Sequence, residues 1–349
     1  MRKLVLLCLL GGVGLMALAA SAMAAPIATP PVDCTGFFNP YDYTAAAISA
    51  CGYQTFPLTD VQALPGGGSR YDYDVNGVME RYYVPPPGFD ALSATPAQLD
   101  EYGLPPQPTD PSAAARWTQQ MANLDVATPP PFLTQLHATA DSVTFYNWSG
   151  YAVTGGSGAF NHAETYYTEP TFYGSRCSSN SEVTWAGIGG YYGSGDDLGQ
   201  DGTLHNIGGA SDHQGWSEIV PGQSIQPQNI FGHPGYQFDA STRRISGGYR
   251  FYMYDYYSRK TLAYDVGLNH YSGDSAEAIA ERPTSGNSLT NLSNFGTLTF
   301  QNTYANGSAI NNFTHHGIHM TNPNNGHDLA DPSGLGSGGA FTDTQHNCN

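Results

Sequence analysis

The chain has 349 residues and carries 12 Lys and Arg side chains against 29 Asp and Glu, a formal charge of −17. Only 12% of its residues are charged, about half the usual share. Such an acidic chain is unsuited to bind nucleic acid through its phosphates, and 40% hydrophobic residues exclude a disordered protein. No internal apolar run reaches the roughly 20 residues of a membrane span. We therefore expect a β-rich protein that binds neither nucleic acid nor a membrane.

The N-terminus has the pattern of a secretory signal peptide. Arg2 and Lys3 form a charged start, a mostly apolar stretch follows over residues 4–18, and small residues before position 25 fit a cleavage site. A membrane anchor is the alternative, but the apolar stretch is short and no basic stop follows it. The pattern predicts a secreted protein whose signal peptide, residues 1–24, is cleaved near Ala24.

Four cysteines follow the predicted cleavage site, and an even number in an exported chain indicates two disulfides. Four cysteines allow three connectivities. We favour Cys34–Cys51 and Cys177–Cys348, because each pair then lies within one of two segments of different composition. No CxxC motif is present, which disfavours a zinc or redox site.

The first segment after the signal peptide, residues 25–140, is rich in Pro, and its last Pro run marks a natural boundary. Thr95, followed by Pro, predicts a short helix that ends at Gly103. Pro111 opens a second helix that extends to about Leu124. We expect this segment to be an N-terminal propeptide or an accessory segment.

The second segment, residues 141–349, consists of short runs of β-branched and aromatic residues separated by Gly, Asn and Ser. Many short strands with turn signals predict an all-β, two-sheet antiparallel sandwich. The residues around Arg259 have the pattern of a hairpin tip. The clearest predicted strands are residues 142–153, 163–172, 183–188, 249–254, 262–266, 296–300 and 317–321.

Most nucleophile and metal chemistries lack their sequence signals. No GxSxG motif is present for a serine nucleophile, and paired cysteines would not be catalytic. On a strand His315 and His319 would share a face while His316 points away, so this cluster is a poor metal site. With no HExxH motif either, we expect no metal and no cofactor.

Carboxylates are the better candidates for chemistry. In residues 276–281 the period of a strand places Glu277, Ile279 and Glu281 on one face and three alanines on the other, as if packed against a second sheet. The same period puts Trp216 and Glu218 together. The plain alternative is that these are solvated polar faces of a half-exposed sheet.

Five motifs in order resemble the glutamic peptidases, also called eqolisins, and in particular their bacterial branch. The resemblance implies a concanavalin-A-like sandwich of two curved antiparallel sheets and an endopeptidase active in acid. The motifs are NWSGY at 147–151, WAGIGG at 185–190, LGQDGT at 198–203, GWSE at 215–218 and AEAIAERP at 276–283.

The resemblance assigns the catalytic glutamine to Gln200 and the catalytic glutamate to Glu281. A glutamate can take the proton of an attacking water and later pass it to the leaving amine. The glutamine amide is neutral at every relevant pH and can donate to the oxyanion, whereas a histidine base would be protonated in acid. The resemblance also implies substrate binding by Trp185, Trp216, Glu218 and Glu277.

This sequence departs from the family pattern at three positions. Gly189 stands where fungal members have Asp, and Ala278 stands where a Trp is usual, a loss of bulk on the buried face. Gly199 splits the usual Leu-Gln pair. None of these departures removes a proposed catalytic group.

Two points stay open at the level of sequence. The family implies a removable propeptide, but residues 25–140 are acidic rather than basic, and a Cys34–Cys51 bridge would favour a stable domain instead. The alternative functions are a non-catalytic, lectin-like carbohydrate-binding protein and a glycosidase that uses Glu218 with Glu281. We expect a monomer that acts on protein or peptide substrates.

Overall fold

The computed structural model describes residues 40–130, 132–135, 146–173, 177, 180–192, 198–206, 213–268, 271–285 and 288–349. The predicted signal peptide, Cys34 and the segment boundary at residue 140 lie outside these residues. No helix within the described ranges is long and apolar enough to cross a membrane.

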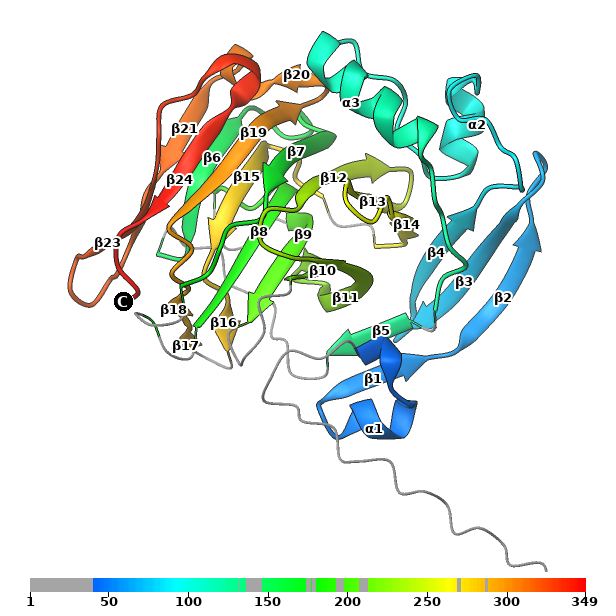
Figure 1. Ribbon diagram of the computed structural model, residues 1–349, viewed down its shortest axis with the longest axis horizontal. Helices are drawn as coiled ribbons and strands as arrows, with labels where there is room; N and C mark the ends of the chain where they lie inside the picture. The colour runs from blue at the N-terminus through cyan, green and yellow to red at the C-terminus, as the bar shows by residue number, and fades with distance from the viewer. Residues whose placement is uncertain are drawn as a thin grey trace, which may run out of the picture. The chain divides into compact units, whose positions relative to one another are not determined.

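The first sheet carries most of the strands predicted to hold functional residues. Among the described residues it has eight strands in the order β11-β10-β9-β8-β15-β6-β21, with β18 paired to β8 (Figure 1). Its strands are β6 (Trp148–Thr154), β8 (Asn180–Ile188), β9 (Leu198–Asn206), β10 (His213–Val220), β11 (Gln223–Gly232), β15 (Ser275–Glu281), β18 (Asn291–Leu292) and β21 (His315–Ile318).

The second sheet has twelve strands in the described part of the chain, in the order β2-β3-β4-β14-β13-β12-β7-β19-β24-β23-β22, with β20 paired to β19. Its strands are β2 (Leu58–Ala63), β3 (Ser69–Val75), β4 (Val78–Val84), β7 (His162–Thr168), β12 (Gln237–Ile245), β13 (Gly248–Asp255), β14 (Thr261–Val266), β19 (Thr297–Ala305), β20 (Ser308–Ala309), β22 (Met320–Thr321), β23 (Asp328–Pro332) and β24 (Phe341–Gln345).

Short elements complete the fold. Two small strand pairs join β1 to β5 and β16 to β17. The remaining elements are β1 (Tyr53–Phe56), β5 (Phe132–Gln135), β16 (Thr284–Ser285), β17 (Ser288–Leu289), α1 (Ala45–Ser49), α2 (Pro96–Glu101), α3 (Pro111–Ala122) and the 3₁₀ turns at Pro40–Asp42, Ile310–Asn312 and Ser337–Gly339.

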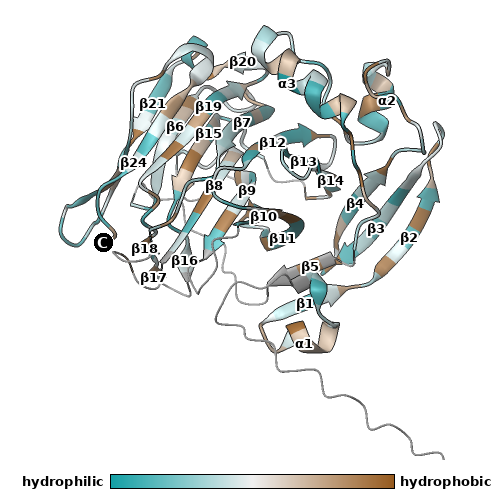
Figure 2. Ribbon diagram, in the orientation of Figure 1, coloured by the Kyte–Doolittle hydropathy of each residue, from teal (hydrophilic) through white to brown (hydrophobic). Residues whose placement is uncertain are grey.

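The two sheets pack face to face around an apolar core, which confirms the predicted β-sandwich. Apolar and polar residues alternate along the strands, as the brown and teal bands of Figure 2 show. The core combines Ala276, Ala278 and Ala280 of the first sheet with Phe238 and Phe300 of the second. The alanines thus face the second sheet, as the alternation in this strand predicts.

Both predicted helices are present, and local signals explain their starts. α2 begins after Thr95. The Thr95 side chain accepts from the Gln98 backbone amide, and the Gln98 side chain accepts from the Thr95 backbone amide, which is a complete capping box. α3 begins after Asp110, which accepts from the first-turn amides. The predicted hairpin tip near Arg259 lies between β13 and β14.

The Pro-rich segment also contains strands that the sequence analysis did not predict. β3 and β4 form a hairpin, and β4 pairs with β14, so that the second sheet runs without a break from the N-terminal segment into the later one. Asn76 and Gly77 at the hairpin turn both have positive φ angles, of 56° and 89°. An Asn-Gly pair suits such a turn because these residues tolerate the left-handed region best.

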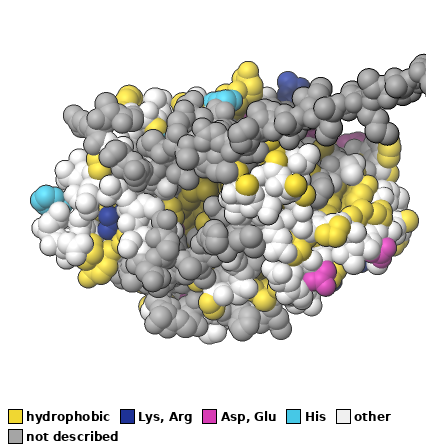
Figure 3. Space-filling view, turned by 90° about the horizontal axis from the view of Figure 1, so that it is seen from below, with side chains coloured by type: hydrophobic (Ala, Val, Ile, Leu, Met, Phe, Trp, Pro, Cys, Tyr) yellow, Lys and Arg dark blue, Asp and Glu magenta, His cyan; other side chains and the backbone are white. Residues whose placement is uncertain are grey.

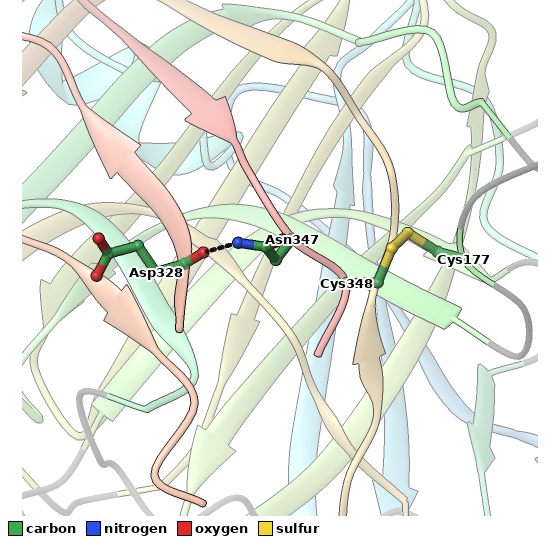
Figure 4. The surroundings of a disulfide bond; sticks show 4 residues. All are labelled: Cys177, Asp328, Asn347 and Cys348. Carbon is green, nitrogen blue, oxygen red and sulfur yellow. Dashed lines mark hydrogen bonds between the residues drawn. A yellow bond between two sulfur atoms is a disulfide. The ribbon is translucent and has the colours of Figure 1, made fainter. Parts of the chain in front are cut away.

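One predicted disulfide, Cys177–Cys348, is confirmed, while Cys34 of the other lies outside the described residues. Cys177 and Cys348 are bonded, with Cα atoms 5.6 Å apart and a sequence separation of 171 (Figure 4). Next to this bond the Asn347 side chain donates to the Asp328 backbone oxygen at 2.8 Å. Cys51 is also disulfide-bonded.

The small share of charged residues in the chain is visible on one face of its surface. On the face drawn in Figure 3, the described Lys, Arg, Asp and Glu side chains are sparse and scattered, and apolar side chains lie among neutral polar ones. Such a surface has few groups to repel one another at low pH.

Candidate active site

One face of the eight-stranded sheet brings together the six side chains for which the sequence predicts a role. Paired residues of neighbouring strands lie on the same face of a sheet. Glu277 of β15 pairs with Gly187 of β8. Gly187 in turn pairs with Gln200 of β9, and Gln200 with Glu218 of β10. Three of the polar candidates therefore form one row across four strands.

The next row on this face is apolar. Ile279 of β15 pairs with Trp185 of β8, and Gly202 of β9 separates Trp185 from Trp216 of β10. Glu281 lies two residues beyond Ile279 on the same side of β15. All six predicted side chains are at most 2% exposed. We call this surface, defined by its six predicted residues, the site face.

Glu281 is oriented through both oxygens of its carboxyl group. The Asn147 side-chain amide donates to Oε1 at 2.6 Å, and the Trp185 indole N–H donates to Oε2 at 2.8 Å. Both donors are neutral, and the amide nitrogen of Asn147 and the indole nitrogen of Trp185 can only donate. Such bonds favour the ionised carboxylate over the protonated acid. The arrangement therefore suits a side chain that must act as a base in acid.

Gln200 lies within a strand rather than in a turn, where its glycine-rich surroundings could have placed it. Its Nε2 donates to Glu218 Oε2 at 2.9 Å. This bond uses one of the two amide hydrogens and leaves the second available. Its Oε1 is buried and has no hydrogen-bond partner within the described ranges. The side chain can thus offer one donor and one acceptor to a substrate.

Glu277 is the second carboxyl of the row that contains Gln200. Burial raises its pKa well above the usual range, opposed by a hydrogen bond with Ser275 and assisted by the charge of Asp274. Burial thus favours the protonated form of Glu277, whereas the two donors on Glu281 favour its ionised form. A Cβ on the intervening Gly187 would lie 2.7 Å from the Trp185 ring, so this position must lack a side chain.

Tryptophan side chains form the apolar part of the site face. Trp148 and Trp185 meet edge to face with ring centroids 4.8 Å apart. Trp216 belongs to the same buried cluster, together with Ile279. The indole N–H of Trp216 is buried and has no hydrogen-bond partner in the described part of the chain. It is thus a further donor for a polar ligand atom.

Gly199, one of the departures from the family pattern, has a packing reason. A Cβ at this position would lie 2.5 Å from the Tyr249 ring of the second sheet. Glycine therefore lets the two sheets approach directly behind Gln200. The departure leaves the orientation of Gln200 toward the site face intact, because alternate strand residues point to opposite faces.

Asn147 is the site residue that sequence reasoning missed. It stands in the first family motif, but its contact with Glu281 spans 134 residues and leaves no local pattern. It is fully buried, and its backbone oxygen accepts from the Arg282 amide at 3.0 Å. The signal that the sequence offers for this residue is its polar side chain directly before the strand that begins at Trp148.

The histidines of the predicted cluster contact separate partners. His316 Nε2 contacts Thr154 Oγ1 at 3.0 Å, and His319 Nδ1 lies 2.7 Å from an oxygen of Asp331. Within the residues that the structure describes, no three His, Cys, Asp or Glu side chains are arranged to hold a metal ion.

Comparison with known proteins places this geometry in a family. A family model described as the Peptidase A4 family matches residues 146–336, more than half of the chain. The chain belongs to the Peptidase A4 family. The predicted membership of the glutamic peptidases is confirmed, and the protein is a glutamic endopeptidase, a hydrolase that acts on protein or peptide substrates. Its assignment to the bacterial branch stays a prediction.

Two solved structures are also similar to this glutamic peptidase. One is scytalido-glutamic peptidase with a transition state analog inhibitor, at 17% identity and a TM-score of 0.48. The other is scytalido-glutamic peptidase with a peptide-based transition state analog, at 19% identity and a TM-score of 0.47. Each match covers 60% of this chain and 100% of the other. A comparison with curated protein sequences found no match.

Proposed function

We propose that the protein is a secreted endopeptidase that works in acid, with Glu281 as general base and acid and Gln200 as the oxyanion donor. The observation that carries the proposal is the pair of donors on Glu281, on the same face as Gln200. Membership of a peptidase family favours peptide hydrolysis over the lectin-like and glycosidase alternatives.

In the proposed reaction Glu281 takes a proton from a water that attacks the scissile carbonyl carbon directly. The C–N bond then breaks as the protonated Glu281 passes its proton to the leaving amine. A carboxylate has about four lone-pair sites in all, and Asn147 and Trp185 each donate to one oxygen of Glu281. Holding the carboxylate charged keeps it a base where a free glutamate would begin to protonate, near pH 4.3.

Gln200 is proposed to stabilise the negative oxygen that forms during the attack. Glu218 accepts one hydrogen of its amide, which fixes the direction of the other. A fixed donor aimed at the developing charge is typically worth about 2.7–4 kcal/mol of barrier. Glu277, Trp185 and Trp216 would line the bound peptide on the same face.

The proposed site needs access for a peptide. Gln200 and Glu281 are each 2% exposed, so a substrate must displace part of the chain to reach them. We expect the full-length protein to show little activity until it is treated with acid. The acidic composition and the disulfides are consistent with a protein that works outside the cell.

The proposal is tested with an unfolded protein substrate across pH 2–7. Wild type is compared with Glu281→Gln and Gln200→Ala after identical acid treatment. We expect loss of about 10³-fold or more in kcat for the first variant and about 10²–10³-fold for the second. His319→Gln changes an exposed side chain that contacts Asp331 instead of a site residue; it serves as the matched control and should retain full activity.

Two outcomes would contradict the proposal. Full activity in either Glu281→Gln or Gln200→Ala would exclude the corresponding catalytic role. Absence of proteolysis by acid-treated wild type at any pH would favour a non-catalytic binding protein, and binding of oligosaccharides would then identify the lectin-like alternative.

A further inference from the structure

Asn147 connects to the strand of Glu281 at two points. Its side-chain Nδ2 donates to Glu281 Oε1 at 2.6 Å, and its backbone oxygen accepts from the Arg282 amide at 3.0 Å. Asn147 has no exposed surface. Its side chain therefore has little freedom to leave the carboxyl group, and it follows any movement of the end of β15.

The second donor, Trp185, holds the other carboxyl oxygen. Two neutral donors on two different oxygens fix the plane of the Glu281 carboxylate. They also stabilise its charged form against the effect of burial, which favours the neutral acid. Glu277 on the same strand face shows the effect of burial, because its pKa is raised well above the usual range.

We propose that Asn147 is a positioning residue that keeps Glu281 ionised in acid and sets the orientation of its carboxylate. This inference rests on the proposed role of Glu281 as the base. Asn147 does not touch the substrate in this proposal. It determines the lowest pH at which the enzyme works.

The test is the pH profile of kcat/KM for Asn147→Leu, which keeps the size of the side chain and removes the donor. We expect the acid limb of the profile to move up by about one pH unit, because Glu281 then protonates more readily. Asn147→Asp should move it further, since a second carboxyl beside Glu281 opposes its ionisation. Asn322→Leu is the control, because Asn322 is equally buried but contacts the C-terminal residue Asn349 instead.

The outcomes separate this inference from the proposed function. An acid limb that coincides in Asn147→Leu and wild type would overturn it, while an inactive Glu281→Gln would still support the role of Glu281. If Asn147→Leu does not fold, Asn147→Ala, which removes the donor with a smaller side chain, decides the question. A shift in that variant supports the two-donor arrangement, and an unmoved profile overturns it.

A second inference concerns residues 40–135, which we call the N-terminal segment. Its strand β4 pairs with β14, with Tyr82 opposite Tyr264. The two rings stack with centroids 4.8 Å apart, and the Tyr82 hydroxyl donates to Gln228 Oε1 at 2.9 Å. Phe56 and Tyr73 of the segment share a buried cluster with Ile219, directly after the site residue Glu218.

Buried polar groups join the N-terminal segment to the rest of the chain. The Arg250 guanidinium contacts Asp100 of the segment at 2.7 Å and Asp265 of β14 at 2.6 Å. Tyr83 donates to the same Asp265 at 2.7 Å. Gln120 of α3 donates to Asp239 at 2.8 Å. Removing the segment would take one partner from each of Arg250, Asp265 and Asp239 and would expose the β14 edge, which is unfavourable.

We infer that the N-terminal segment is a permanent part of the active enzyme and not a propeptide that leaves. This inference does not depend on the roles of Gln200 and Glu281. The protein is expressed at full length, treated with acid until it is active, and passed over a sizing column at the pH of activity. Intact mass and N-terminal sequencing then identify the chains in the active fraction.

We expect residues 40–135 in the active fraction, whether or not the connection to the later strands has been cut. A folded, fully active fraction that begins near residue 141 and lacks the segment would overturn the inference. Tyr82→Ala should lower both the melting temperature and the retention of the segment, whereas the exposed Val61→Ala in edge strand β2 should change neither.

Discussion

Two consecutive residues of β6, Trp148 and Ser149, lie beside two buried carboxyl groups whose surroundings differ. Trp148 pairs with Glu281 on the site face, whose two oxygens accept from two donors. Ser149 points between the sheets, where it donates to one oxygen of Asp343 at 2.8 Å. The second oxygen of Asp343 has no partner within the described residues, and burial raises its pKa to about 7. The two carboxyls thus differ in how their oxygens are paired, because both oxygens of Glu281 accept a hydrogen bond whereas one oxygen of Asp343 accepts none from the described residues.

The largest predicted effect is the loss of catalytic activity when a carboxyl of the site face is changed to an amide. Glu281→Gln and Glu277→Gln change the same chemical group on the same face of β15. We expect the first to lose about 10³-fold or more in kcat, because an amide cannot accept a proton from water. The second should retain activity within about tenfold, because a neutral acid and an amide offer similar hydrogen bonds. Equal losses in both variants would show that Glu277 also acts in its charged form.

The second effect is on the pH dependence of folding. Burial and the charge of Asp239 raise the pKa of Glu164 to about 8, although Arg116 opposes the shift, and the pKa of Asp343 is raised to about 7. These carboxyls bind protons more tightly in the folded than in the unfolded chain. Their stabilising contribution is complete below about pH 4 and is lost as the pH rises through 7 to 8.

Two buried histidines act in the opposite direction. Burial lowers the pKa values of His162 and His205 to about 3, with help from the charges of Arg243 and His213 respectively. Their contribution is present above about pH 6.5 and is lost as the pH falls toward 3. We expect the free energy of unfolding, measured by urea titration, to be greatest between about pH 4 and 6 and to fall by several kcal/mol at pH 8. A rise in stability from pH 6 to pH 8 would contradict this assignment.

The strand of Glu281 could be predicted in detail from the sequence. Strict alternation in residues 276–281 identifies both of its faces, and the structure places the alanines against the second sheet and Ile279 in the cluster of the site face. Gln200 was different, because its glycine-rich surroundings fit a turn equally well. Only the resemblance to a family singled it out.

The N-terminal strands and Asn147 show where such reasoning fails. The Asn76-Gly77 turn between two Tyr- and Val-rich runs is a hairpin signal, but the many prolines of the segment obscured it. The pairing of β4 with β14 joins residues far apart in the chain, and local patterns do not reveal such contacts. The hydrogen bond from Asn147 to Glu281 likewise joins residues far apart in sequence, 134 positions, and only the three-dimensional structure reveals it.

The smallest of the three effects isolates a single interior carboxyl. Asp343→Asn replaces a carboxyl group whose pKa is raised to about 7 by burial with an amide that never ionises. At pH 4 the two proteins should have similar stability, because Asp343 is already protonated in the folded state. At pH 8 the variant should be more stable than wild type by roughly 2 to 4 kcal/mol, since the folded wild type must bury a charge or retain a proton.

The matched control for Asp343 is Asp328→Asn, which changes an exposed carboxyl on the neighbouring strand β23 and should leave the pH dependence as it is in wild type. Urea titrations at both pH values measure the differences. If Asp343→Asn and wild type lost stability equally between pH 4 and pH 8, Asp343 would be as easily ionised as a solvated carboxyl. A buried carboxyl with one unpartnered oxygen would then still hold a charge, and the pairing of both oxygens would no longer distinguish Glu281 from Asp343.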